Sequence, residues 1–133
     1  RILDAGPDVT VRSLCARQFE TYRNGRINFI ESQTQMRASA RPELERVVAL
    51  AAACRGAMIS ITGHTDASGD ETWNEALSLA RAQAVSDWLV AHGVEADRVV
   101  LVGAGSSEPI ANNATRYGRS LNRRIDIAFA YED

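Results

Sequence analysis

The sequence contains no lysine: all 15 of its basic residues are arginine, which most simply reflects a skewed genomic composition. The 17 acidic residues outweigh them, and the net charge of −2 gives the chain no general attraction to nucleic acid or anionic lipid. No apolar run reaches the roughly 18 residues that a membrane helix needs. Any function must therefore come from a local site.

Cysteine is also scarce, since Cys15 and Cys54 are the only two in the chain. Neither belongs to a CxxC motif or has a histidine at ligand spacing, so we expect no zinc and no other metal site. In an oxidising compartment the pair would close a loop of about forty residues and stabilise the fold by roughly 3 to 4 kcal/mol on the chain-entropy model. The sequence leaves two interpretations open, a disulfide or two buried free thiols.

The length of 133 residues and the 45% apolar and 24% charged composition suit a single globular domain. Because the chain begins at Arg1 rather than at methionine, we expect a processed or excised piece of a longer protein, preceded by a signal peptide, lipid anchor or membrane helix. Residues 1–25 show weak periodicity and are interpreted as an N-terminal arm with a short helix around Val11 to Tyr22. Residues 26–133 form the predicted domain.

Hydrophobic periodicity in the domain predicts alternating strands and helices. The predicted strands are residues 26–30, 57–62, 99–102 and 125–131, the predicted helices are residues 41–54 and 72–92, and a long connection over residues 103–122 includes a helical turn near 115–120. Crossover helices favour some parallel pairing, while the last strand is expected to run antiparallel. The sequence thus predicts a mixed sheet of about four strands with both helices packed on one face.

The helix predicted over residues 72–92 carries two kinds of surface. Its apolar stripe is predicted to pack on the sheet and consists of Trp73, Leu77, Ala80, Ala84 and Trp88. On the flank of that stripe lie Asn74, Ser78 and Arg81. Because this flank is polar in its first two turns and apolar beyond them, it predicts a site that is open only near the start of the helix.

A carboxylate precedes this helix in the run Gly63-His64-Thr65-Asp66, at the end of an apolar strand. A partly buried arginine normally needs a carboxylate, and Asp66 is the nearest candidate for Arg81. In one interpretation the two residues simply pair with each other. In the other, Asp66 accepts hydrogen bonds from a ligand ammonium, Arg81 binds a carboxylate with its planar fork, and Asn74 adds an orienting hydrogen bond. Such a site selects a ligand that carries both groups on one carbon.

These residues are part of a longer ordered pattern. The pattern comprises Gly63-His64-Thr65-Asp66, Gly69, Asn74, Leu77-Ser78, Arg81-Ala82, Gly93, Gly103, Pro109-Ile110-Ala111, Asn113, Gly118-Arg119 and Asn122-Arg123-Arg124. Through it, residues 26–131 resemble the OmpA-like peptidoglycan-binding domain, which is also found in the peptidoglycan-associated lipoprotein and in flagellar stator proteins. The resemblance implies a two-layer βαβαβ-type α+β sandwich that binds cell-wall peptidoglycan non-covalently, with no cofactor and no catalysis.

The resemblance also implies roles for single residues. Asp66 is expected to bind the ammonium, and Arg81 the carboxylate, at the far end of meso-diaminopimelate in the peptidoglycan stem peptide. Asn74 is expected to support them through a hydrogen bond, and Arg123 to make a second contact at the rim. Ser32 lies in the loop after the first strand, which lines the family's site, although this loop lacks the aspartate that many members carry directly after the phenylalanine.

Outside the matching residues, Cys15 implies an N-terminal addition clamped to the first helix of the domain. The resemblance places the protein in the periplasm of a Gram-negative-type cell envelope, attached to a membrane through its missing N-terminal part. Its expected partner is the stem peptide, with another envelope protein as a further candidate.

Several alternatives compete with this interpretation. His64 and Asp66, two residues apart on an extended segment, resemble a catalytic base and its orienting residue, as a peptidoglycan hydrolase would need, but no nucleophile accompanies them. The glycine pair in residues 102–108 lacks the third glycine of a nucleotide site, and Pro109 interrupts the helix such a site requires. Arg123 and Arg124 form a basic patch, but an acidic chain without an aromatic platform does not predict nucleic-acid binding. A protein-interaction module of the cell envelope on the same fold is the most serious rival.

Overall fold

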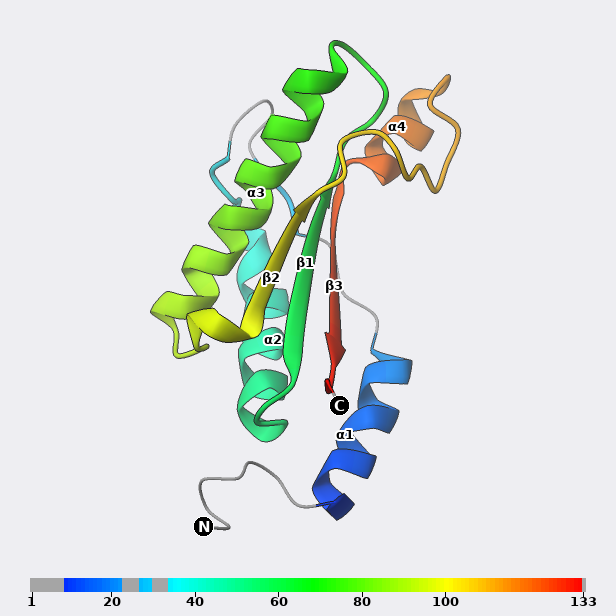
Figure 1. Ribbon diagram of the computed structural model, residues 1–133. Helices are drawn as coiled ribbons and strands as arrows, with labels where there is room; N and C mark the ends of the chain where they lie inside the picture. The colour runs from blue at the N-terminus through cyan, green and yellow to red at the C-terminus, as the bar shows by residue number, and fades with distance from the viewer. Residues whose placement is uncertain (1–8, 23–26, 30–33, 133) are drawn as a thin grey trace.

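The computed structural model describes residues 9–22, 27–29 and 34–132 of the chain (Figure 1). Its helices are α1 (Val9–Thr21), α2 (Arg41–Ala53), α3 (Glu71–Ala91) and α4 (Arg116–Asn122), with short 3-10 turns η2 (Ala38–Ala40) and η3 (Ala96–Arg98). Its strands are β1 (Met58–His64), β2 (Val99–Gly103) and β3 (Arg124–Ala130). Among the described residues, no helix is long and apolar enough to span a bilayer.

The strands form a mixed sheet in the order β2-β1-β3. β1 runs parallel to β2, which follows it through the crossover helix α3, and antiparallel to β3. In this register Ile61 lies opposite both Leu101 and Ile127. Parallel neighbours need such a long crossover connection, whereas an antiparallel strand can return beside its partner directly. The predicted α+β class and the mixed sheet are confirmed.

The number of strands differs from the predicted four, because the described residues form a sheet of three. The predicted strand over residues 26–30 lies partly outside the described residues. Within them, Phe29 makes an isolated antiparallel bridge with Met36.

The hydrophobic core lies between one face of the sheet and the helices α2 and α3 (Figure 1). Successive side chains of a strand point to opposite faces, so Ile59 and Ile61 of β1 are fully buried together with Ile125 and Ile127 of β3. The helices contribute Leu44, Val47 and Ala51 from α2 and Ala82, Val85 and Leu89 from α3. Both helices therefore cover the same face, as predicted.

The prediction of which side of α3 packs on the sheet is wrong. Trp73 is 60% exposed, whereas Asn74, Ser78 and Arg81 are buried. The reason is a close approach between α3 and β1, where a side chain on Gly63 would overlap the backbone carbonyl of Ser78. Small and polar residues fit where two backbones come this close, so Trp73 at the start of the predicted stripe is displaced to the surface, whereas Trp88 farther along the helix still packs against the core.

This close approach gives a first testable prediction. Gly63→Ala should lower the free energy of unfolding by about 3 kcal/mol, because the backbone of Ser78 cannot rotate away from the added methyl group. Gly56→Ala is the control: Gly56 has φ 86° but no atom within 4 Å of the added Cβ, so only backbone strain of about 1 kcal/mol is expected. Urea unfolding of both variants measures the difference, and equal losses would contradict the proposed steric cause.

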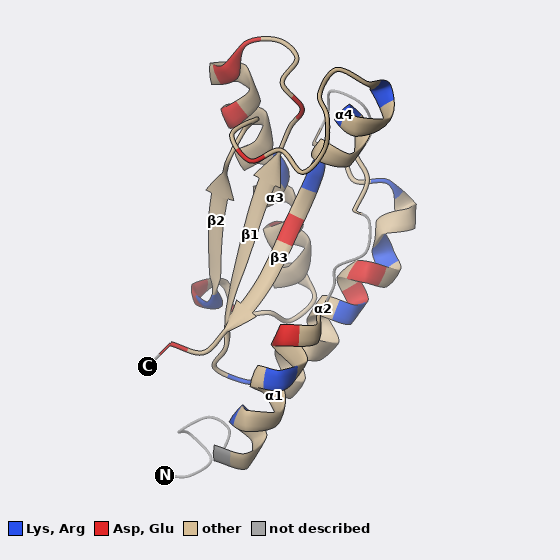
Figure 2. Ribbon diagram, turned by 90° about the vertical axis from the view of Figure 1, so that its right-hand side faces the viewer, with Lys and Arg blue, Asp and Glu red and all other residues tan. Residues whose placement is uncertain are grey.

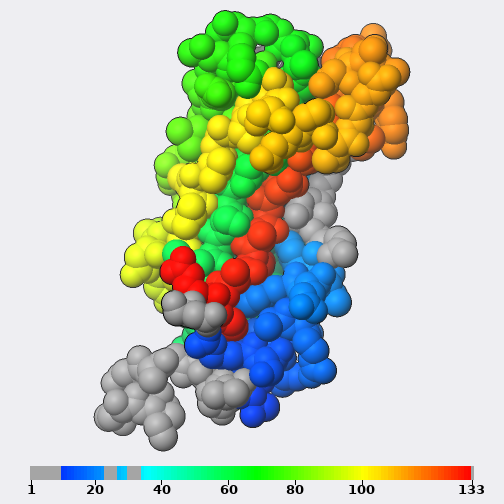
Figure 3. All heavy atoms as spheres, turned by 45° about the vertical axis from the view of Figure 1, so that its right-hand side comes forward, coloured from blue at the N-terminus to red at the C-terminus, as the bar shows by residue number. Residues whose placement is uncertain are grey.

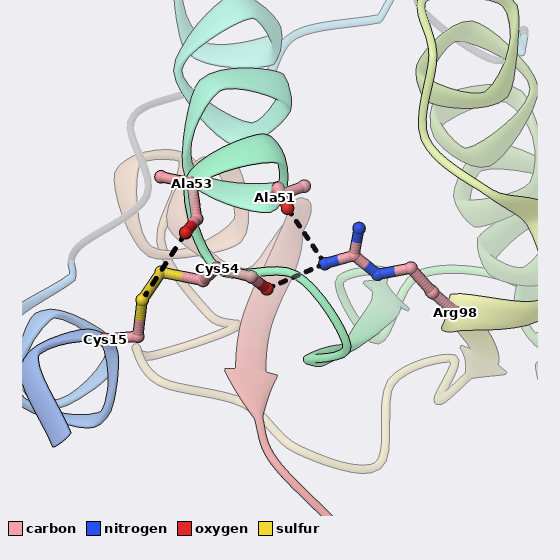
Figure 4. Close-up of a disulfide and its surroundings, with 5 residues drawn as sticks. All are labelled: Cys15, Ala51, Ala53, Cys54 and Arg98. Atoms are coloured by element: carbon pink, nitrogen blue, oxygen red, sulfur yellow. Dashed lines mark hydrogen bonds between the residues drawn. A yellow bond between two sulfur atoms is a disulfide. The ribbon is translucent and has the colours of Figure 1, made fainter. Parts of the chain in front are cut away.

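The short helix predicted in the N-terminal arm is α1, which is tied to the core at the end of α2. Cys15 and Cys54 form a disulfide, which decides between the two interpretations that the sequence left open (Figure 4). Phe19 of α1 stacks on Phe129 of β3 with 5.4 Å between the ring centroids. Arg98 donates a hydrogen bond of 3.0 Å to the Cys54 carbonyl and so satisfies one of the acceptors that the end of α2 leaves (Figure 4).

Candidate ligand-binding site

A cavity of about 840 Å³ lies where β1 ends and β3 begins. Its walls come from the loop after β1, the first turns of α3, the helix α4 and the start of β3. The helix α4 and the loop that precedes α3 lie at one end of the molecule, whereas α1 lies at the opposite end (Figure 3). Four predicted site residues, Asp66, Asn74, Arg81 and Arg123, line this cavity. Ser32 lies outside the described residues.

The pairing of β1 with β3 brings Asp66 and Arg123 together. His64 lies opposite Arg124 in this antiparallel pair, so the residues just beyond the paired ends meet. Arg123 Nη1 lies 2.6 Å from Asp66 Oδ2. The ion-pair partner that the structure gives Asp66 is therefore Arg123, and not only the Arg81 that the sequence suggested. Sequence spacing could not reveal the partner because the contact depends on the strand register.

The Asp66 carboxylate is buried and held in place on both oxygens. Oδ1 accepts a hydrogen bond of 2.8 Å from the Ser68 backbone N–H, and Oδ2 accepts one from Arg123. Burial by itself would raise the pKa of Asp66, but the hydrogen bonds from Ser68 and Arg123 outweigh it and hold the pKa below its ordinary value. Asp66 is therefore ionised at neutral pH. Each carboxylate oxygen has a second lone pair that can accept a ligand donor.

The Arg81 guanidinium lies on the α3 side of the cavity and is 9% exposed. Its central carbon lies 5.0 Å from the centroid of the Phe29 ring, a cation–π contact. Burial first, and then repulsion from the nearby Arg123 charge, lower the pKa of Arg81. An arginine nevertheless stays protonated at neutral pH. An anion bound near both groups would relieve this repulsion.

Asn74 supports the loop that carries Asp66. Its Nδ2 donates hydrogen bonds to the carbonyls of Ser68 at 3.0 Å and Asp66 at 3.5 Å. A hydrogen bond also joins this loop to the residues that follow β2, because the Thr65 N–H donates to the Gly105 carbonyl at 2.8 Å. Asn74 thus holds the loop that positions the Asp66 carboxylate, and its hydrogen bond to a ligand stays a prediction.

Asn122 is a positioning residue to which the sequence assigned no role, although it belongs to the ordered pattern. It is fully buried, and its Oδ1 accepts hydrogen bonds from the N–H groups of Ile110 and Ala111. Its Nδ2 donates to the Ala111 carbonyl and to Asn113 Oδ1. Asn122 therefore fixes the long connection against α4 and β3. The sequence signals were its place in that pattern and directly before the basic pair, and neither distinguishes a buried amide from a surface one.

His64 does not belong to the described lining of the cavity. Its ring is buried, and Nε2 lies 3.0 Å from Asp126 Oδ2. The contact with His64, more than any other influence, holds the pKa of Asp126 below its ordinary value. The carboxylate beside this histidine is thus Asp126 on β3, not Asp66 as a catalytic pair would require.

The fold and the cavity together define a class of protein: a two-layer α+β domain in which a β1-α3-β2 crossover unit and an antiparallel β3 surround a polar cavity with charges of both signs. The chain belongs to the OmpA family, whose model matches residues 28–123. The helix α1 lies outside this match.

Relatives and solved structures agree with this assignment. The peptidoglycan-binding protein ArfA of Mycobacterium tuberculosis is 49% identical over 84 residues, which cover 63% of this chain and 26% of that protein. The peptidoglycan-associated lipoprotein from Burkholderia pseudomallei superimposes with a TM-score of 0.74 at 25% identity, covering 79% of this chain and 90% of that one. The cell wall anchor of the T6SS from Pseudomonas aeruginosa has a TM-score of 0.68 at 32% identity, covering 80% and 76%. The chain thus spans about a quarter of the length of ArfA.

Proposed function

We propose that this domain binds cell-wall peptidoglycan non-covalently through the diaminopimelate of the stem peptide and thereby anchors its parent envelope protein to the wall. The observation that carries the proposal is that one cavity contains the Asp66 carboxylate and the Arg81 and Arg123 guanidinium groups. The names of ArfA and of the T6SS cell wall anchor support it, because these similar proteins are a peptidoglycan-binding protein and a cell wall anchor.

Each residue has a role in this proposal. Asp66 accepts the ammonium of the free end of diaminopimelate through its remaining lone pairs, while Arg81 receives the carboxylate of the same carbon. Arg123 interacts with both of these residues, because it forms an ion pair with Asp66 and its positive charge repels that of Arg81. A ligand carboxylate near Arg81 and Arg123 places a negative charge between two positive ones. Ser32 remains a predicted contact from the loop after Phe29.

The proposal extends to location and binding strength. The domain works in the periplasm, and the disulfide suits such an oxidising compartment. One amino-acid end group offers few contacts, so the affinity of a single site is modest. Many copies bound to one polymeric wall supply avidity.

A calorimetric titration with two soluble stem peptides tests the proposal. The peptide with diaminopimelate should bind, and the matched peptide with lysine should bind at least about tenfold more weakly, because lysine lacks the terminal carboxylate that Arg81 receives. Equal affinity for both peptides would contradict the assigned roles. Absence of binding to either would favour the protein-interaction module instead.

A second measurement separates binding from hydrolysis. Prolonged incubation of purified sacculi with the domain should release no soluble muropeptides, because the His64 ring contacts Asp126 and does not belong to the described cavity lining. Steady release that His64→Ala abolishes would support the hydrolase alternative.

A further inference from the structure

One wall of the cavity is an arginine-rich face of α4. Arg116, Arg119, Ser120 and the C-cap residue Arg123 all line the cavity. Their spacing of three, four and seven residues places them on one side of a helix. Figure 2 shows basic residues on α4 and at the start of β3. The charge of this wall is therefore a property of one helix face and not of scattered surface side chains.

The described lining of the cavity is strongly cationic, although the protein has a net charge of −2. Six arginines occur among its described lining residues, and Asp66 is the one acidic residue there. Arginines gathered in a concave site create a positive potential that attracts ligands of negative charge.

Some of these arginines already have carboxylate partners. Arg123 pairs with Asp66, and Arg124 Nε lies 3.2 Å from Asp126 Oδ2. Arg116 and Arg119, by contrast, have no acidic side chain within ion-pair distance in the described part of the chain. Arg119 donates one hydrogen bond of 3.0 Å to the Asn113 carbonyl and keeps its other donors, and Arg116 is exposed.

In the proposed function, the end group of diaminopimelate uses Arg123 of this wall but neither Arg116 nor Arg119. It brings one ammonium and one carboxylate, which Asp66 and Arg81 match in the proposed function, and its net charge is zero. Further positive charge in the same cavity is useful only to a ligand that carries more than one carboxylate. Beside the end group, the α-carboxyl of the γ-linked glutamate and the in-chain carboxyl of diaminopimelate supply such carboxylates.

We propose that Arg116 and Arg119 form a second anion subsite that binds another carboxylate of the same stem peptide, so that the cavity recognises an acidic peptide and not an isolated zwitterionic end group. The inference rests on the proposed function. It also predicts that amidation of that carboxylate regulates binding, because amidation removes the negative charge that the subsite binds.

The test uses synthetic Ala-γ-Glu-diaminopimelate in three forms: with all carboxyl groups free, with the glutamate α-carboxyl amidated, and with the in-chain diaminopimelate carboxyl amidated. Amidation of the recognised carboxyl should weaken binding to the unmodified protein about fivefold, the scale of a partly exposed charge pair. Arg116→Gln should weaken binding of the acid peptide by the same factor and leave binding of that amide unchanged. Arg116→Glu should weaken binding of the acid peptide more than Arg116→Gln does.

Arg17→Gln, an exposed arginine on α1 at the other end of the molecule, is the matched control and should change none of the affinities. Because Arg116 is exposed, its variants should keep the fold, and a circular dichroism spectrum checks this. Indifference of the protein to both amidations, or equal losses for acid and amide peptides in Arg116→Gln, would overturn the subsite while leaving the end-group site intact. Failure of all three peptides to bind would overturn the proposed function itself and the subsite with it.

Discussion

Asp66→Asn and Arg81→Ala are each expected to abolish retention of the domain on purified sacculi. Truncating one partner of a desolvated charge contact costs roughly 2 to 5 kcal/mol, which is at least about thirtyfold in affinity. Asp66→Asn keeps the size of the side chain and an acceptor for the Ser68 N–H, so it removes the charge with little change in the loop. Co-sedimentation at several protein concentrations and titration with the soluble diaminopimelate peptide measure the loss.

Three further variants sharpen this result. Arg81→Lys keeps the positive charge but not the planar fork, so it should bind more weakly than the unmodified protein and better than Arg81→Ala. The exposed residues Asp97 and Arg17 supply controls, because Asp97→Asn and Arg17→Ala make matched changes of charge outside the described cavity lining. All variants should keep the circular dichroism spectrum of the fold. Undiminished sacculus binding by both Asp66→Asn and Arg81→Ala would show that the site is elsewhere.

Removing the disulfide is expected to have the largest effect on stability. Cys15 and Cys54 are separated by 39 positions in the sequence. A loop of this size stabilises the folded state by roughly 3 to 4 kcal/mol on the chain-entropy model, because its closure restricts the unfolded chain. The double variant Cys15→Ala/Cys54→Ala should lose about that much free energy of unfolding in a urea titration.

The same variant should bind the diaminopimelate peptide normally, because α1 lies at the opposite end of the molecule from α4, which lines the cavity (Figure 1). A reducing agent should destabilise the unmodified protein by a similar amount and leave the double variant unchanged. A loss of binding that parallels the loss of stability would instead connect the N-terminal arm to the site.

The local signals in the sequence predicted much of the fold. Pro42 in the first turn of α2 and Gly93 just after α3 mark helix ends where they were expected. The alternation of apolar residues in β1 and β3 identified the buried side of each strand, since Ile59 and Ile127 both face the core. These features depend on periods of two and 3.6 residues, which the chain carries wherever it folds.

The side of α3 that packs on the sheet could not be predicted from these periods. Apolar character assigned Trp73 to the sheet, but Gly63 allows the two backbones to meet, and the space that remains accepts Ser78 instead. Hydrophobicity ranks side chains by their transfer from water, whereas a close contact selects them by size. A single sequence does not show which part of α3 will meet the strand at the close approach that Gly63 permits.

For the charged residues of the site, too, the sequence determined one part and only the tertiary structure decided the other. The residue types at Asp66 and Arg81, and the helix flank that carries Arg81, were determined by the sequence, and both side chains line one cavity. Only the tertiary structure decided that Arg123 pairs with Asp66 and that Arg116 belongs to the same cavity. Those contacts join segments far apart in the chain through the antiparallel register of β1 and β3 and the placement of α4, and local periodicity contains no information about either.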